Sequence, residues 1–355
     1  MKTFLPDYRH MVSAAANRKP ARMPIYEHIV SPEIMGQVLG IEMHCPGPND
    51  DKSTSRDFYA KICRFWKDMT YDTVSFEGTI VEVLPDHGAI LGGRPGPIQS
   101  RADFDRYPFD EIPELYWKRW TPHLDALAKE LPEGIKAVGG CGNGVFEISE
   151  DLVGYEYLCL LMFDDPALFA ELYVTIGNLM MKLWSRMLER YGQLFAVCRM
   201  GDDLGYKTST LLAPATIVEH ILPQYARIIS LIHGAGKPFL LHSCGNIFSV
   251  MDDILNTGIN AKHSNEDQIA PFGRWIELYG NRIGLFGGID LNLLCTQDRK
   301  TVFDEVVRLG REFRIQAKGY ALGSGNSIPE YVPAENYLAL IEAANEIRRR
   351  EDASP

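Results

Sequence analysis

A histidine and a cysteine two residues apart are the residues of this sequence best suited to metal chemistry. The apolar run Phe239–Leu241 ends in His242, and Cys244 follows just before the turn-forming pair Gly245 and Asn246. In an extended strand, residues i and i+2 project from the same face, so the two side chains direct an imidazole and a thiolate at one point. These ligands suit zinc, which takes about four N, S or O ligands and keeps one position open in catalytic sites. The alternative interpretation is a core histidine beside a cysteine that acts as a small hydrophobe.

Two adjacent carboxylates form a second candidate cluster. The β-rich run Leu194–Met200 ends shortly before Asp202 and Asp203, and Tyr206 follows them closely. A purely structural turn does not need this many polar groups. The simpler alternative is that one of the two aspartates only caps the next helix.

The chain alternates short β-rich runs with longer helical patterns, which predicts an α/β fold. Eight strands are expected, at about residues 22–28, 71–76, 135–140, 194–200, 238–242, 259–264, 282–286 and 318–322. Eight strands separated by helices are what a (β/α)8 TIM barrel needs, and such barrels carry their catalytic side chains at the C-terminal strand ends. The polar side chains that follow the expected strands are Glu27, His28, Glu77, Cys141, Asp202, Asp203, His242, Cys244, His263, Asp290 and Ser324.

No linker divides the chain, so residues 1–355 are expected to form a single barrel domain. Residues 79–110 interrupt the alternation after the second strand with a Gly- and Pro-rich stretch, and we expect an insertion or lid there. Among the expected helices, residues 148–161 form one helix, and residues 214–235 form another that Pro223 kinks.

Composition narrows the classes of function. The formal net charge of −11 argues against a nucleic-acid surface, which needs a basic field. No apolar run reaches the roughly 18 residues of a membrane span, and the first residues turn polar too early for a signal peptide. Seven scattered cysteines do not resemble a disulfide framework. A reducing cytoplasm is therefore the expected location.

Four segments together resemble a known family. The runs Gly201–Lys207, Gly236–Asn246, Gly258–Asp267 and Leu285–Asp290 are similar to the uroporphyrinogen decarboxylase superfamily, and within it to the cobalamin-dependent methyltransferase branch. The resemblance implies a TIM barrel that binds zinc through a His-x-Cys pair and a later cysteine in a Gly-Cys-Gly turn. His242 and Cys244 match the first two of these ligands.

The third cysteine of that pattern is missing. Ser324 stands between Gly323 and Gly325 where the resemblance places a thiolate, and Cys295 is a poor substitute by position. The sequence leaves four residues as open alternatives for the third ligand: Cys141, Glu27, Asp203 and Glu266. A zinc ion with one thiolate fewer is harder, which favours an oxygen-bearing substrate such as an aryl methyl ether.

The resemblance implies a methyl transfer between a small substrate, either a methoxy aromatic or a thiol, and the corrinoid of a separate protein. Asp202, Asp203 and Tyr206 are then expected to position the substrate or deliver a proton. The residues expected to line the substrate site are Glu27, His28, Glu77, His263 and Ser324. Two alternatives stay open: a porphyrinogen decarboxylase, although little positive charge is available for its substrate's carboxylates, and a barrel that binds a ligand without a metal.

Overall fold

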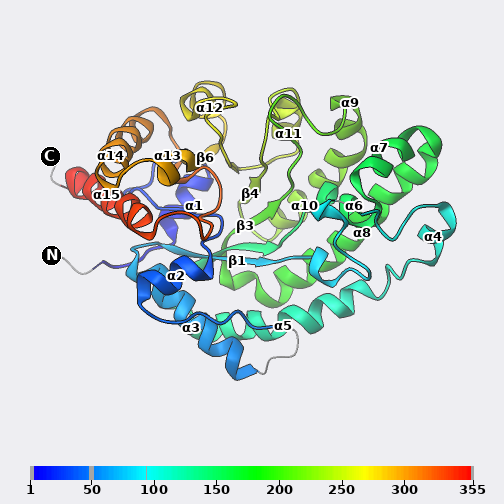
Figure 1. Cartoon of the computed structure of the whole chain (residues 1–355), viewed down its shortest axis with the longest axis horizontal. Helices are drawn as coiled ribbons and strands as arrows, with labels where there is room; N and C mark the ends of the chain where they lie inside the picture. The colour runs from blue at the N-terminus through cyan, green and yellow to red at the C-terminus, as the bar shows by residue number, and fades with distance from the viewer. Residues whose placement is uncertain (1–3, 48–51, 93, 353–355) are drawn as a thin grey trace.

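A parallel sheet curls around the centre of the molecule. The computed structural model describes residues 4–47, 52–92 and 94–352, and within them the sheet has seven strands in chain order (Figure 1). The strands are β1 (Thr73–Gly78), β2 (Lys136–Cys141), β3 (Phe195–Gly201), β4 (Phe239–His242), β5 (Ala261–His263), β6 (Gly284–Ile289) and β7 (Tyr320–Ser324). Each coincides with an expected strand to within a few residues, and the barrel-like α/β fold is confirmed.

The expected first strand is shorter than the sequence suggested. Residues 22–28 contribute one isolated parallel bridge, between Ile25 and Leu322 of β7. Two backbone hydrogen bonds flank it, from Tyr26 to the Leu322 carbonyl (2.8 Å) and from Leu322 to the Pro24 carbonyl (3.0 Å). Pro24 has no N–H to donate, which keeps the ladder short. The segment therefore lies beside β7 at the edge of the sheet without becoming a full strand.

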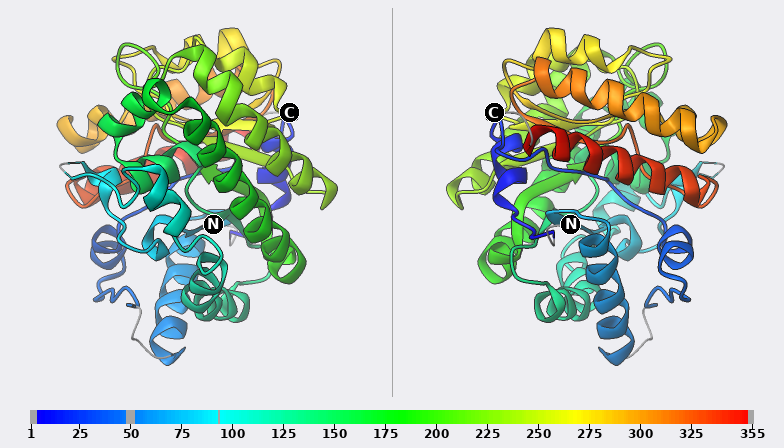
Figure 2. Two further views of the ribbon diagram at one scale, coloured as in Figure 1. Left: turned by 90° about the vertical axis from the view of Figure 1, so that its right-hand side faces the viewer. Right: turned by 90° about the vertical axis from the view of Figure 1, so that its left-hand side faces the viewer.

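Helices surround the sheet, and the last two, α14 and α15, run side by side along one flank (Figure 2). The short helix α1 closes the N-terminal end of the barrel, where Met11, Ala14 and Ala15 pack among the inward side chains of the strands. These three helices and seven others begin and end as follows: α1 (Arg9–Ala15), α2 (Pro32–Leu39), α3 (Lys52–Asp68), α5 (Ile112–Glu130), α8 (Pro166–Tyr191), α11 (Met251–Asn256), α12 (Phe272–Tyr279), α13 (Leu291–Thr296), α14 (Arg299–Gln316) and α15 (Ala334–Asp352).

Two expected helices are interrupted. Residues 148–161 fall in two helices, α6 (Val145–Val153) and α7 (Tyr155–Asp164), because Gly154 adopts a φ of 85° that ends the first one. The region 214–235 contains α9 (Pro214–Thr216), a π-helical turn (Ile217–Ile221) and α10 (Leu222–Gly234). The irregular turn lies directly before Pro223, which lacks the N–H that a continuous helix uses there.

The segment 79–110 is irregular but anchored. It contains two 3-10 turns, Val81–Val83 and Ala89–Leu91, and the short helix α4 (Arg101–Arg106). The carboxylate of Asp151 on α6 accepts hydrogen bonds from the backbone N–H groups of Gly88 (2.8 Å) and Ile90 (3.1 Å). A role for the segment as an insertion or lid stays a prediction, as does the single-domain organisation.

The strand register brings the candidate residues together. Gly201 pairs with His242, and His242 pairs with His263, so the ends of β3, β4 and β5 lie in one row. Because the carboxyl ends of parallel strands meet at one end of a barrel, Glu77 of β1 and Ser324 of β7 open on the same mouth. No helix in the described ranges is long and apolar enough to cross a bilayer.

Candidate metal centre

Three donor atoms converge at the mouth, just beyond β3 and β4. The Nε2 atom of His242 lies 3.4 Å from Cys244 Sγ and 3.9 Å from Asp203 Oδ1, and all three donor atoms lie within 4.8 Å of one another. The backbone fixes this arrangement, because Cys244 N donates a hydrogen bond to Asp203 Oδ1 at 2.8 Å. Tetrahedral zinc holds N and S ligands about 2.0–2.3 Å from the ion, which requires ligand separations close to those seen here. The donor set therefore fits zinc.

A chain of hydrogen bonds sets which nitrogen of His242 is free. His263 Nε2 lies 3.1 Å from the backbone carbonyl of Ser324, which only accepts, so this nitrogen carries the hydrogen. Burial lowers the pKa of His263 to about 3 and that of His242 well below its usual value, so both rings are neutral. His263 Nδ1 must then accept from His242 Nδ1, 2.7 Å away. His242 Nε2 is left with its lone pair directed at Cys244 and Asp203, which is the tautomer that a metal ligand needs.

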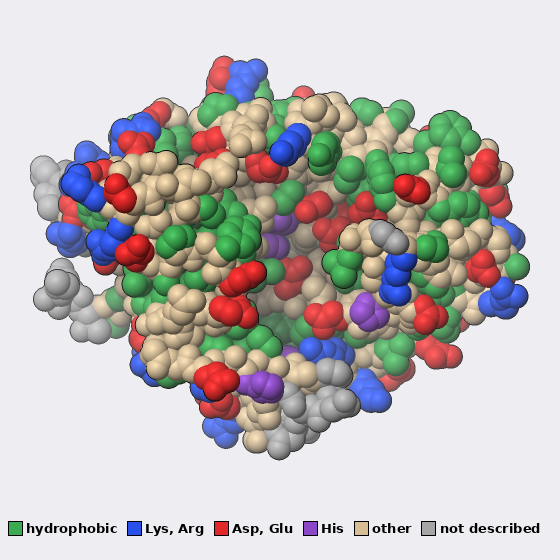
Figure 3. Space-filling model, in the orientation of Figure 1, with side chains coloured by type: hydrophobic (Ala, Val, Ile, Leu, Met, Phe, Trp, Pro, Cys, Tyr) green, Lys and Arg blue, Asp and Glu red, His purple; other side chains and the backbone are tan. Residues whose placement is uncertain are grey.

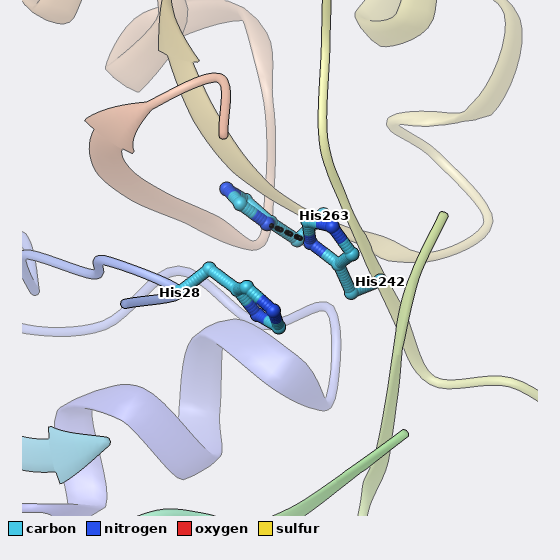
Figure 4. A group of neighbouring side chains, drawn as sticks. All are labelled: His28, His242 and His263. Atoms are coloured by element: carbon cyan, nitrogen blue, oxygen red, sulfur yellow. Dashed lines mark hydrogen bonds between the residues drawn. The ribbon is translucent and has the colours of Figure 1, made fainter. Parts of the chain in front are cut away.

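A second group of three histidines lies beside these donors but has a different geometry. His28 stacks on His242 with ring centroids 3.7 Å apart and planes 14° apart, while His263 is hydrogen-bonded to His242 (Figure 4). Stacked rings hold their nitrogen lone pairs in parallel planes, so they do not converge on one ion. One nitrogen of His242 and one of His263 are also used by the bond between them. His28 and His263 therefore hold the His242 ring in place through stacking and a hydrogen bond.

The surroundings of Cys244 suit a thiolate. Ser264 Oγ and Asn326 Nδ2 each donate to Cys244 Sγ at 3.4 Å. Two donors aimed at one sulfur stabilise its anionic form, and the charge of Lys262 acts in the same direction, although burial raises the pKa of the Cys244 thiol. A bound metal ion would add further positive charge that favours the thiolate.

Of the four open alternatives for the third ligand, the structure brings Asp203 to the donor pair. Cys141 is fully buried beside Tyr116 of α5. Glu27 accepts a hydrogen bond from the backbone N–H of Ser324. Glu266 accepts one from the backbone N–H of Gly245 at 3.3 Å. The side chain of Asp203 is 43% exposed, which leaves it open to the mouth.

A buried ion pair lies beside His28, the ring that stacks on His242. Arg199 of β3 donates to Glu77 Oε2 at 2.8 Å, and the same oxygen lies 3.4 Å from His28 Nε2. Arg199 also donates to the carbonyl of His28 at 3.0 Å, which ties the first barrel segment to the sheet. Sequence reasoning missed Arg199; the signal was a charged residue in the middle of an otherwise apolar strand.

The two adjacent aspartates have different roles. Asp202 is fully buried, and its carboxylate accepts from the N–H groups of Phe146 (3.1 Å) and Glu147 (2.9 Å) and from the hydroxyl of Tyr225 (2.6 Å). These bonds cap the N-terminus of α6 from a neighbouring strand. The contacts therefore favour the capping interpretation for Asp202, on a helix that precedes it in the chain, and only Asp203 faces the donors.

A second buried carboxyl lies beneath the barrel mouth. Glu27 accepts hydrogen bonds from the backbone N–H (2.9 Å) and the hydroxyl of Ser324. Burial raises the pKa of Glu27 to about 8, so the group is mostly protonated at neutral pH. Ser324 thus occupies the place of the expected cysteine and bonds to a carboxyl instead of facing the donors.

Tyr206, the last of the site residues expected from the sequence, lies outside the group formed by Asp203, His242 and Cys244. The side chain of Tyr206 is 61% exposed, and its backbone joins a turn with Ser209 and Asn246. A catalytic role for Tyr206 stays a prediction. Figure 3 shows the resulting mouth as a hollow in which histidine and acidic side chains are visible.

The chain belongs to the uroporphyrinogen decarboxylase (URO-D) family. The sequence model of this family matches residues 91–347, which is more than half of the chain. A search of curated protein sequences gives no match.

Two solved structures share the fold. A methyltransferase from Methanosarcina mazei has a TM-score of 0.71 at 16% identity, covering 96% of this chain and 99% of that one. A B12-independent methionine synthase from a Shewanella species has a TM-score of 0.52 at 14% identity, again covering 96% of this chain and 99% of the other. Likeness at such low identity shows the fold alone.

Proposed function

We propose that this URO-D family member is a zinc-dependent methyltransferase that moves a methyl group between a small substrate and the corrinoid of a partner protein. The observation that carries the proposal is the convergence of Asp203, His242 and Cys244, with the His242 tautomer set for metal binding. The fold shared with the M. mazei methyltransferase agrees with it.

The donor set defines what the metal contributes. Asp203, His242 and Cys244 would hold the zinc ion, which would supply Lewis acidity toward the thiol or ether oxygen of a substrate. The two substrate classes consistent with this chemistry are thiols and methoxy aromatics.

The protein's own residues prepare that position. His263 holds His242 in the required tautomer, while Ser264 and Asn326 hold the sulfur of Cys244. His28, His242 and His263 are almost entirely buried, so they exclude water from the inner side of the site. Asp203 is the donor on the open side, where a substrate approaches.

The corrinoid partner is part of the same proposal. The donors lie at the C-terminal ends of the strands, where the mouth is hollow and open (Figure 3). A corrinoid protein docked over this mouth would bring its methyl-carrying face to the substrate.

The decisive experiment measures zinc and methyl transfer on the same samples. We expect about one zinc per chain in the wild type and in Cys295→Ser, a matched cysteine substitution away from the donors, and loss of zinc in His242→Ala and Cys244→Ser. Reduced cobalamin with a methyl donor should form methylcobalamin only with the first two proteins, which the absorbance spectrum follows. A folded wild-type protein that takes up no zinc from a supplemented buffer contradicts the proposal.

Decarboxylation of a porphyrinogen is the second candidate, because the family description carries that name. Such a substrate brings several carboxylates. The buried cation Arg199 is already paired with Glu77, burial lowers the pKa of the buried Lys262 to about 7, and Asp203 adds negative charge at the mouth. Turnover of uroporphyrinogen by metal-free protein is the result that would favour this candidate.

A further inference from the structure

The barrel has a seam where its first segment meets β1. On one side this segment is hydrogen-bonded to β7 through the backbone, as described above. On the other side, no backbone hydrogen bond joins residues 22–31 to β1 within the described ranges. Side chains span the gap instead, because Ser75 Oγ and Arg199 Nη1 both donate to the carbonyl of His28.

A cleft opens at this seam, and we call it the seam cleft. It has a volume of about 340 Å³ and runs from Ser75 and Glu77 at the barrel mouth to helices α3 and α5. Ligand pockets start at about 300 Å³, and about 150 Å³ is enough to hold a benzene ring. The cleft is thus large enough for one substituted ring.

The outer walls of the seam cleft are mainly aromatic and aliphatic. The large side chains that line it are Phe58, Tyr59, Ile62 and Trp66 from α3 and Trp120 from α5. Flat aromatic walls favour a flat apolar guest through stacked and edge-to-face contacts. A small hydrophilic thiol would leave these walls in contact with water.

The charges in the seam cleft cancel. Arg119 uses all its nitrogens: Nη1 faces His123 Nε2 (2.5 Å), Nη2 donates to the Pro46 carbonyl (3.3 Å), and Nε lies 3.4 Å from Glu82. Glu77, at the inner end, is neutralised by Arg199. Arg119 and Glu77 thus each face a group of opposite charge, so the cleft suits a neutral ring better than a charged one.

Two hydroxyl groups provide polar contacts. His123 Nε2 accepts from Arg119, so its Nδ1 carries the hydrogen and donates to the Tyr59 oxygen at 3.3 Å. The Tyr59 hydrogen is then free to bond an ether or phenol oxygen. Thr79 also lines the cleft, and its buried hydroxyl has no hydrogen-bond partner among the described residues.

The inner end of the cleft is close to the candidate metal centre. Glu77 Oε1 and the Cδ2 atom of His242 both lie 3.9 Å from the position that a Cβ on residue 201 would occupy. Glycine at this position leaves the space between them open. The inner end of the cleft, at Glu77, therefore lies close to His242.

From these observations we infer that the seam cleft binds the ring of a neutral methoxylated aromatic substrate, with its methoxy group turned toward His242. The inference rests on the proposed methyltransferase function, and it selects one of the two substrate classes. Thr79 and Tyr59 are the polar contacts that recognise the ring's oxygen atoms.

Calorimetric titration with 2-methoxyphenol tests ring binding directly. We expect the wild type to bind it at least tenfold more tightly than 4-methoxybenzoate, which has a similar ring with a charge. Thr79→Phe, which fills the cleft, should weaken binding at least tenfold. Thr79→Val keeps the size of the side chain but removes its hydroxyl, so it should weaken binding by only about two- to tenfold, the cost of one hydrogen bond. Asn292→Phe is the control that should stay within about twofold of the wild type, because it places the same bulk at an exposed position outside the seam cleft.

The outcomes separate the inference from the function on which it rests. Equal binding of the neutral and charged rings, or unchanged binding in a folded Thr79→Phe protein, overturns the inference, and so does binding of 2-mercaptoethanesulfonate in place of the ring. The comparison of the two rings needs no variant, so it holds even if Thr79→Phe does not fold. Zinc uptake without ring binding rejects the cleft alone, whereas ring binding without zinc uptake rejects the methyltransferase mechanism.

Discussion

The two sides of the barrel mouth differ in how their strands pair. On the donor side, the ladder of β3, β4 and β5 places Gly201, His242 and His263 in one row, and hydrogen bonds fix each ring. On the seam side, the ladder is missing between the first segment and β1, and a cleft with aromatic walls opens there. Continuous pairing gives the precision that a metal centre requires, whereas an interrupted sheet gives the space that a substrate requires.

The largest effect should come from Asp203, which tests whether the donor side holds a metal through three ligands. We expect Asp203→Ala to weaken zinc binding by more than about 100-fold, because loss of a ligand should exceed the 10–100-fold cost of losing an outer hydrogen-bond partner. Competition with a chelator of known affinity measures it. Glu266→Gln is the matched control, since its carboxylate faces the backbone of Gly245. Equal losses in both variants would remove Asp203 from the site.

His263 tests whether the histidine row supports the metal or holds it. His263→Phe removes the acceptor for His242 Nδ1, and we expect zinc affinity to fall about 10–100-fold. His28→Phe keeps a flat ring stacked on His242 and should leave zinc affinity nearly unchanged. A loss in His28→Phe as large as that in His263→Phe would instead assign the metal to the three histidines.

Asp202 tests the capping role assigned to it. Asp202→Asn keeps one oxygen acceptor where the carboxylate offers two, so it loses hydrogen bonds to the start of α6 or to Tyr225. We expect the free energy of unfolding to fall by about 1–3 kcal/mol, while the zinc content stays unchanged. Urea denaturation and elemental analysis measure the two quantities. Loss of activity at full stability would return Asp202 to the catalytic residues.

Glu27 joins the seam segment to β7 and should make stability depend on pH. Burial raises its pKa from 4.5 to about 8, so the folded state holds this proton more tightly than the unfolded state. Its contribution is complete below about pH 4.5 and is lost as the pH rises through about 8. Relative to Glu27→Gln, the wild type should lose up to about 1.4 kcal/mol per pH unit in this window. Parallel curves from urea denaturation at pH 5, 6.5 and 8 would show that Glu27 is already ionised.

The smallest effect concerns the charge balance of the seam cleft. Glu82→Gln leaves Arg119 without its acidic neighbour, whose side chain is 46% exposed. We expect 4-methoxybenzoate to bind about two- to fivefold more tightly, with the gain shrinking at high salt, because exposed ion pairs contribute little. Binding of 2-methoxyphenol should not change. A gain for both rings would mean that Glu82 affects the shape of the cleft and not its charge.

The sequence by itself determined the order of the strands and the pair of residues, His242 and Cys244, at the centre of the candidate site. Alternating β-rich and helical patterns located seven strands to within a few residues, because a buried parallel strand needs an apolar run. The spacing of His242 and Cys244 placed both side chains on one face, since that relation is local to a strand end. The family likeness of the motifs agrees with the matched family.

Only the tertiary structure decided which partners these residues meet. It separated Asp202, which caps a helix that begins 57 residues earlier in the chain, from Asp203. It also placed Asp203, and none of the three other candidates for the third ligand, beside His242 and Cys244. It also revealed the hydrogen bonds that run from His242 through His263 to the Ser324 carbonyl, the Arg199–Glu77 ion pair and the seam cleft. These features depend on contacts between residues far apart in the chain, and one sequence has no local pattern that encodes such distances.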